Sequence, residues 1–100
     1  MKIVTSRKDR LDILSNLARS TGDRIGIEMK PFDFAAMADR SEEIHWMYRF
    51  DEHRIRIFRV QSGSQLFRDI QIERDDAINV DEIADQIEQI VTELEGRHSK

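Results

Sequence analysis

The chain has 100 residues, a formal net charge of −4, 39% hydrophobic and 36% charged residues, and no cysteine. We expect residues 1–100 to form a single domain with one core, because the hydrophobic content is that of a globular chain rather than a disordered one. The lack of cysteine excludes disulfides and thiolate chemistry and fits a cytoplasmic protein. The overall acidity argues against non-specific nucleic-acid binding, and no apolar run is long enough to span a membrane.

A helix is predicted over residues 7–21. Ser6 precedes it with a hydroxyl that can accept an unpaired backbone N–H, and Asp9 places a negative charge in the first turn, where the helix dipole favours it. Apolar residues then recur at helical spacing, which is typical of a helix with one buried side. Gly22 stands where a glycine commonly ends a helix.

A half-buried strand is predicted over residues 24–30, because apolar and polar side chains alternate there until Pro31. The sequence leaves open which strand lies beside it. Residues 32–40 fit either a short helix or a loop. A proline just ahead and the alanines within favour the helix, whereas the alternation of Phe32 and Phe34 favours an extended segment.

The middle of the chain predicts a three-stranded antiparallel meander. A turn at residues 51–54 pairs Tyr48 with Ile57 and puts the large apolar side chains on one inner face. A second turn, around Gly63 and the serine after it, is expected to place Ile57 opposite Ile70 on that same face. The strands of this meander are expected at residues 44–50, 54–61 and 66–73.

A C-terminal helix is predicted over residues 79–95, with Asn79 and Glu82 in capping positions. Its apolar residues step by three and four, as expected for a helix that packs on the sheet: Val80, Ile83, Ile87, Ile90 and Leu94. Its other side is acidic: Asp81, Glu82, Asp85, Glu88 and Glu93. The predicted fold class is therefore α+β, an antiparallel sheet packed with N- and C-terminal helices.

The sequence contains no grouping of residues that predicts catalysis. Strand spacing places His45 and His53 about eight extended residues apart, or roughly 25 Å, so the two cannot share a metal ion. We therefore predict no metal site and no cofactor, and we expect both histidines to be exposed to solvent. Neighbouring acids in loops lack the apolar surroundings that raise the pKa of a catalytic carboxyl group. The protein is not expected to be an enzyme.

The outer face of the predicted sheet is the candidate functional surface. Four apolar side chains lie there beside two aligned arginines, an unusual composition for a face that meets only water. Three explanations of this face are open. The N-terminal helix or the segment after Pro31 covers it, as in a sheet packed between helices. Alternatively, a protein partner or a second copy binds it, or single-stranded nucleic acid stacks on its aromatic rings. The residues assigned to this face are His45, Met47, Arg49, Arg56, Phe58, Val60 and Phe67.

The sequence thus predicts a small non-enzymatic cytoplasmic protein that acts by protein contact, as an accessory, regulatory or inhibitor-like module. Its partner is expected to be another protein or a second copy, which would make a homodimer through the outer sheet face. Two alternatives involve nucleic acid. The protein would be a nucleic-acid-binding regulator that uses the arginine and phenylalanine surface, or its acidic helix would mimic nucleic acid toward a nucleic-acid-binding protein.

Overall fold

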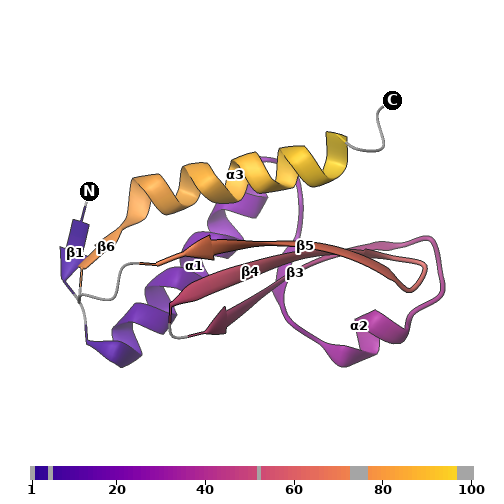
Figure 1. Cartoon of the computed structure of the whole chain (residues 1–100), viewed down its shortest axis with the longest axis horizontal. Coiled ribbons are helices and arrows are strands. Elements are labelled where there is room, and N and C mark those ends of the chain that lie inside the picture. The colour runs from indigo at the N-terminus through magenta and orange to yellow at the C-terminus, as the bar shows by residue number, and fades with distance from the viewer. Residues whose placement is uncertain (1, 5, 52, 73–76, 97–100) are drawn as a thin grey trace.

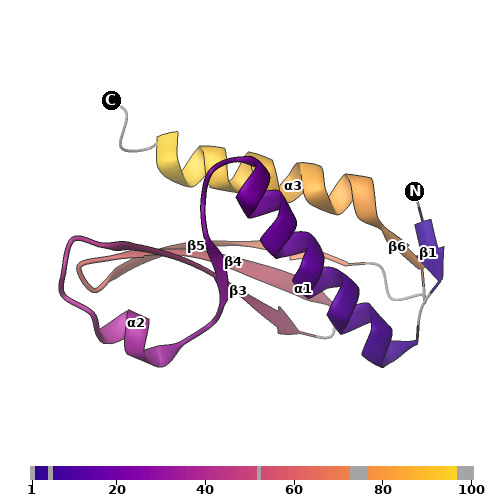
Figure 2. The same ribbon diagram turned by 180° about the vertical axis from the view of Figure 1, so that it is seen from behind.

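The chain folds around a mixed β-sheet that carries helices on both faces (Figures 1 and 2). The structure is a computed structural model, and it describes residues 2–4, 6–51, 53–72 and 77–96. The sheet has the strand order β2-β3-β4-β5. Its strands are β2 at Met29–Pro31, β3 at Ile44–Asp51, β4 at Arg54–Gln61 and β5 at Ser64–Gln71.

Helices α1 (Arg7–Arg24) and α3 (Val80–Gly96) share one face of the sheet, and the short helix α2 (Phe34–Ala38) lies against the other. In Figure 1, α3 runs along the upper side of the strands and α2 sits below them. A second, two-stranded ribbon joins β1 (Lys2–Val4) to β6 (Ala77–Asn79) in antiparallel fashion. This ribbon was not predicted. In the part of the chain that the structure describes, no helix combines the length and the apolar character that crossing a membrane requires.

Helix α1 begins where the sequence predicts but ends later. Asp9 donates its backbone N–H to the Ser6 hydroxyl at 3.3 Å, so the expected N-terminal cap is confirmed. Gly22 does not end the helix. It is buried within it, and a Cβ there would lie 3.1 Å from the Cβ of Met29, so glycine lets the chain return closely past the helix. The left-handed residue after the helix is Gly26, at φ +85°.

The first predicted strand is shorter than expected and changes the fold class in one respect. Residues up to Arg24 belong to α1, so only Met29–Pro31 remains extended as β2. This strand pairs with β3 in parallel, with Met29 opposite Trp46. The wholly antiparallel sheet of the prediction is therefore wrong, and the sheet is mixed. Parallel neighbours need a crossover of about a dozen residues, which the segment containing α2 supplies.

The first hairpin of the meander has the predicted register, and the second does not. Tyr48 lies opposite Ile57 as expected. Ile70, however, pairs with Ile55 rather than with Ile57, a shift of two residues. The cause is the turn, which sits at Ser62 and Gly63, both with positive φ (53° and 80°), as a type I′ turn requires. An even shift preserves which face each side chain occupies, so the predicted inner and outer faces remain correct.

The last strand of the meander was predicted to end at residue 73 and to pair that residue with Arg54. Residue 73 lies outside the described residues, and Arg54 pairs with Gln71.

Helix α3 packs on the sheet as expected. Its capping is confirmed, because Glu82 donates its backbone N–H to Asn79 Oδ1 at 3.1 Å. The main core joins α1, α3 and the inner sheet face. Its central members are buried nearly completely: Leu14, Tyr48, Ile55, Ile57, Ile70, Ile87, Val91 and Leu94.

Candidate functional site

The outer sheet face is largely covered by the segment that contains α2. Met47, Phe58 and Val60 form a second, smaller core, with Phe32, Ala36 and Met37 packed against it. The cover is tied to β3 through its backbone, since residue 32 donates its N–H to the carbonyl of residue 48 at 2.9 Å. Three of the seven residues assigned to an exposed binding face are therefore buried, and they cannot touch a partner while α2 is in place.

A continuous line of four rings crosses this face, and we call it the aromatic row: Phe34, Phe32, Phe58 and Phe67. Ring centroids are separated by 4.9 Å, 5.1 Å and 5.6 Å along the row. The two ends are exposed, with Phe34 at 75% and Phe67 at 43% of full accessibility, whereas Phe58 in the middle is buried. The row thus presents an aromatic side chain at each end and is anchored in the core between them.

Arginines accompany the aromatic row. The guanidinium of Arg49 lies 5.3 Å from the ring centroid of Phe32, and that of Arg56 lies 5.1 Å from the ring centroid of Phe67. Both are within the range of a cation–π contact. Arg56 Nε also donates to Asp69 at 2.9 Å, and Arg54 approaches the same carboxylate at 3.4 Å. Asp69 therefore neutralises part of this positive charge.

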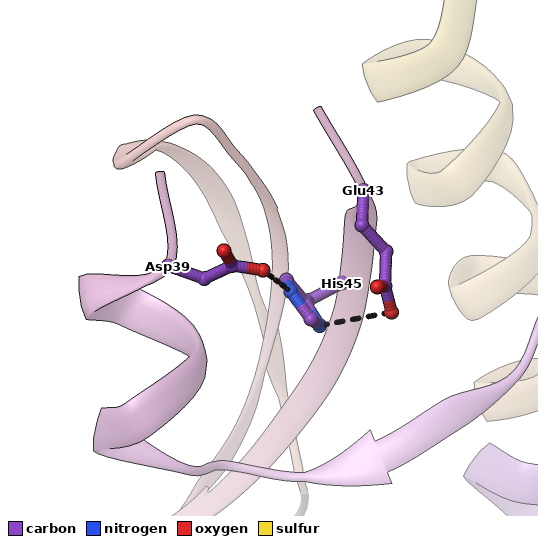
Figure 3. A group of neighbouring side chains, drawn as sticks. All are labelled: Asp39, Glu43 and His45. Carbon is purple, nitrogen blue, oxygen red and sulfur yellow. Dashed lines mark hydrogen bonds and ion pairs between the residues drawn. The ribbon is translucent and has the colours of Figure 1, made fainter. Parts of the chain in front are cut away.

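A group of titratable side chains lies at another part of the outer face: Asp39, Glu43 and His45 (Figure 3). The imidazole of His45 lies between the two carboxylates. Its Nε2 is 2.8 Å from Asp39 Oδ2, and its Nδ1 is 4.0 Å from a Glu43 oxygen. The His45 side chain is 17% exposed. The expectation of a solvent-exposed histidine is therefore wrong for His45, and His53 is also partly buried.

Asp39 is the most constrained member of this group. His45 donates to it, the Ser41 backbone N–H donates to Oδ1 at 2.9 Å, and the Ser41 hydroxyl donates to Oδ2 at 2.8 Å. These hydrogen bonds, with that from His45 first, lower the pKa of Asp39 to about 2. Stabilisation of the ionised form by donors is the physical cause. The carboxylate therefore remains charged at any physiological pH.

The loop that carries Asp39 is held by the turn between β4 and β5. Ser62 donates both its backbone N–H and its hydroxyl to the Ser41 carbonyl, at 3.1 Å and 3.0 Å. Gln61 Nε2 donates to the Glu42 carbonyl at 2.9 Å. Sequence reasoning missed this arrangement because it left the conformation of residues 31–43 open. The available signal was the spacing Asp-x-x-x-Glu-x-His, which converges only once the loop is fixed.

An open cleft of about 650 Å³ lies between α2 and the sheet. Its walls are mainly apolar and include Pro31, Phe32 and Ala36, and Asp39 and His45 also line it. The carboxylate of Asp39 and the imidazole of His45 thus line a space that a small ligand or water can enter.

The acidic side of α3 is partly neutralised. Glu88 forms an ion pair with Arg24 of α1 at 3.0 Å, and Glu93 forms one with Arg68 of β5 at 2.9 Å. These contacts weaken the hypothesis that α3 imitates the phosphates of nucleic acid, because two of its acids already have cationic partners.

Comparison with known proteins gives no family for this chain. No family model matches it, and neither the curated proteins nor the solved structures that were searched contain a similar protein.

Proposed function

We propose that this is a non-enzymatic cytoplasmic protein that acts by binding another protein through the exposed ends of the aromatic row. The observation that carries the proposal is the exposure of Phe34 and Phe67 at the two ends of a row whose centre is buried. Aromatic side chains and arginine are enriched at the energetically dominant positions of protein interfaces. The row supplies both, with Arg49 and Arg56 stacked on its rings.

The buried centre makes the surface suitable for binding because it limits the freedom of the exposed rings. Phe67 contacts Phe58, which is packed against the sheet, and Phe34 contacts Phe32 in an edge-to-face arrangement. A side chain that is already ordered loses little conformational entropy when a partner covers it. The half-buried ring of Phe67 therefore retains most of the free energy that its further burial contributes.

A second copy of the chain is the partner that this geometry supports best. Among the described strands, β5 pairs with β4 alone, so its other edge is open. The Phe67 carbonyl accepts a hydrogen bond from Arg68 Nη1 at 2.9 Å instead of from a strand. Two β5 strands paired edge to edge would join two aromatic rows, after each Arg68 side chain has moved aside. Strand addition at an open edge is a common mode of association.

The test is the molar mass measured by multi-angle light scattering over a concentration series. We expect a dimer that dissociates on dilution, and we expect Phe67→Ser to be monomeric at every concentration. Leu11→Ser is the matched control, because Leu11 is similarly exposed (47%) but lies on α1. A wild-type protein that stays monomeric rejects the second copy as partner. A dimer that Leu11→Ser disrupts as much as Phe67→Ser does would reject the proposed surface.

The nucleic-acid alternative makes a different prediction. If single-stranded nucleic acid stacks on Phe67 and the arginines bind phosphate, retention on an immobilised oligonucleotide should fall steeply with salt. The pairing of Arg54 and Arg56 with Asp69 weakens this alternative, because a phosphate would have to compete with the carboxylate. Retention at low salt that Arg56→Ser abolishes would favour it over protein contact.

A further inference from the structure

The structure assigns a divalent transition-metal site, with Zn²⁺ as its best-fitting ion, to Asp39, Glu43 and His45. One ligand atom from each of these side chains lies within 4.8 Å of the other two (Figure 3). An imidazole nitrogen and carboxylate oxygens are ordinary zinc ligands, with bond lengths of about 2.0–2.2 Å. This site is independent of the aromatic row, and it revises the expectation of no metal.

The fold brings the three residues together from different local structures. Asp39 is the residue that ends α2, Glu43 immediately precedes β3, and His45 lies on the outer face of β3. The intervening loop reverses direction and is fixed to the turn at Ser62 by backbone and side-chain hydrogen bonds. The loop that carries Asp39 therefore has a defined conformation before any ion binds.

Ser41 supplies the outer support that metal sites commonly have. Its backbone N–H and its hydroxyl donate to the two different oxygens of Asp39, which fixes the orientation of this carboxylate. Groups that orient a ligand in this way strengthen metal binding because the ligand need not be ordered when the ion arrives. This support distinguishes the group from exposed acids that only happen to be neighbours.

Entry of an ion requires a slight separation of His45 from Asp39 and a turn of the Glu43 side chain. His45 Nε2 and Asp39 Oδ2 are 2.8 Å apart, and a tetrahedral ion with bonds of about 2.0 Å would hold them about 3.3 Å apart. The ion would take the place of the hydrogen that now joins the two atoms. The Glu43 side chain is 69% exposed, so its carboxylate is sterically able to turn from Nδ1 toward the same ion.

The cleft beside the site supplies the remaining coordination position. Asp39 and His45 line this cleft of about 650 Å³, so a water molecule can reach an ion bound to both. Three protein ligands and one water are the arrangement of an open zinc site. The imidazole favours Zn²⁺ over Mg²⁺ or Ca²⁺, which prefer oxygen ligands throughout.

The test is calorimetric titration of the metal-free 100-residue chain with ZnCl₂. We expect saturable binding of one ion per chain. We expect His45→Gln to weaken the affinity about tenfold or more and Glu43→Gln to weaken it measurably. His53→Gln is the matched control, because His53 is outside the group, and it should bind as the wild type does. Far-ultraviolet circular dichroism checks that each variant is folded, and the exposure of Glu43 makes Glu43→Gln informative even if His45→Gln does not fold.

Three outcomes would overturn the assignment. The first is an absence of saturable binding. The second is binding that both His45→Gln and Glu43→Gln leave unchanged. The third is binding that His53→Gln weakens as much as either of these, which would indicate adventitious association with histidine in general. A rise of the wild-type melting temperature with added ZnCl₂, absent in Glu43→Gln, would support the assignment through stability, because a ligand that binds only the folded state stabilises it.

Discussion

Replacement of Phe58 by alanine, compared with the same replacement of Phe67, tests whether α2 covers the outer face. Phe58 is 4% exposed and Phe67 is 43% exposed, although the two rings are in contact. Truncation of a buried phenylalanine costs about 3–5 kcal/mol, because burial is lost and a cavity remains. The Phe67 side chain is only about half buried, so its truncation removes about half of the roughly 1.5–3 kcal/mol that full burial contributes, and it leaves no closed cavity. For Phe67→Ala we therefore expect the free energy of unfolding to fall by about 1 kcal/mol.

Urea denaturation followed by the fluorescence of Trp46 measures this difference. Trp46 is the only tryptophan in the chain and is buried on the other face of the sheet, so the mutations do not alter its immediate contacts. With an m-value of about 1.5 kcal/mol/M, a loss of about 3 kcal/mol lowers the midpoint by about 2 M. Phe58→Leu, with a smaller expected loss of about 1–2 kcal/mol, provides a measurable variant if the alanine variant does not fold.

Equal midpoints for the Phe58 and Phe67 alanine variants would refute the reasoning. That result would mean that Phe58 is accessible in solution and that α2 does not rest on the sheet. The outer face would then be a larger exposed patch, which is one of the alternatives that the sequence leaves open. A loss below about 1 kcal/mol for Phe58→Ala alone would have the same meaning, since surface substitutions usually cost about 0.5 kcal/mol or less.

Two further predictions concern the turn and the loop beside the zinc site. Gly63→Ala should lower the free energy of unfolding by about 1–2 kcal/mol, because Gly63 is left-handed at φ +80°, and an unchanged urea midpoint would contradict the assigned turn. The pKa of Asp39 is lowered to about 2 in the folded protein. Its ionised carboxylate therefore stabilises the fold fully at pH values above the pKa of the unfolded chain. This stabilisation is lost as the pH falls through the pKa of the folded protein. The difference in free energy of unfolding between the metal-free wild type and Asp39→Asn should therefore shrink as the pH falls from about 4 toward 2. A pKa near 4 for the Asp39 carboxyl group in an NMR titration would contradict the hydrogen bonds from His45 and Ser41.

The sequence predicts the parts of this fold that depend on local pattern. Ser6 and Asn79 cap their helices as expected, because a capping hydrogen bond involves residues only three positions apart. The pairing of Tyr48 with Ile57 follows from a tight turn and alternation, and both are readable from neighbouring residues. The register of the second hairpin was wrong because two turn positions, one residue apart, satisfy the same alternation.

The candidate sites could be predicted only in part. The aromatic row joins Phe32 and Phe34 to two strands that follow much later, and the sequence alone allowed that segment to cover the face or to lie elsewhere. His45 was predicted to be exposed to solvent and to share no metal ion with His53, because the two histidines are about eight extended residues apart. Its partner Asp39 is close only because the loop between them is folded back on the turn at Ser62.

The amino-acid order by itself determined the two long helices, the two faces of the meander and the apolar side of α3, because each depends on a periodicity of two or of about 3.6 residues. Only the tertiary structure decided that β2 runs parallel to β3, that α2 buries Met47, Phe58 and Val60, and that Asp39 meets His45. These features depend on where an irregular connection returns to the sheet, and that position is set by packing between segments rather than by any local pattern.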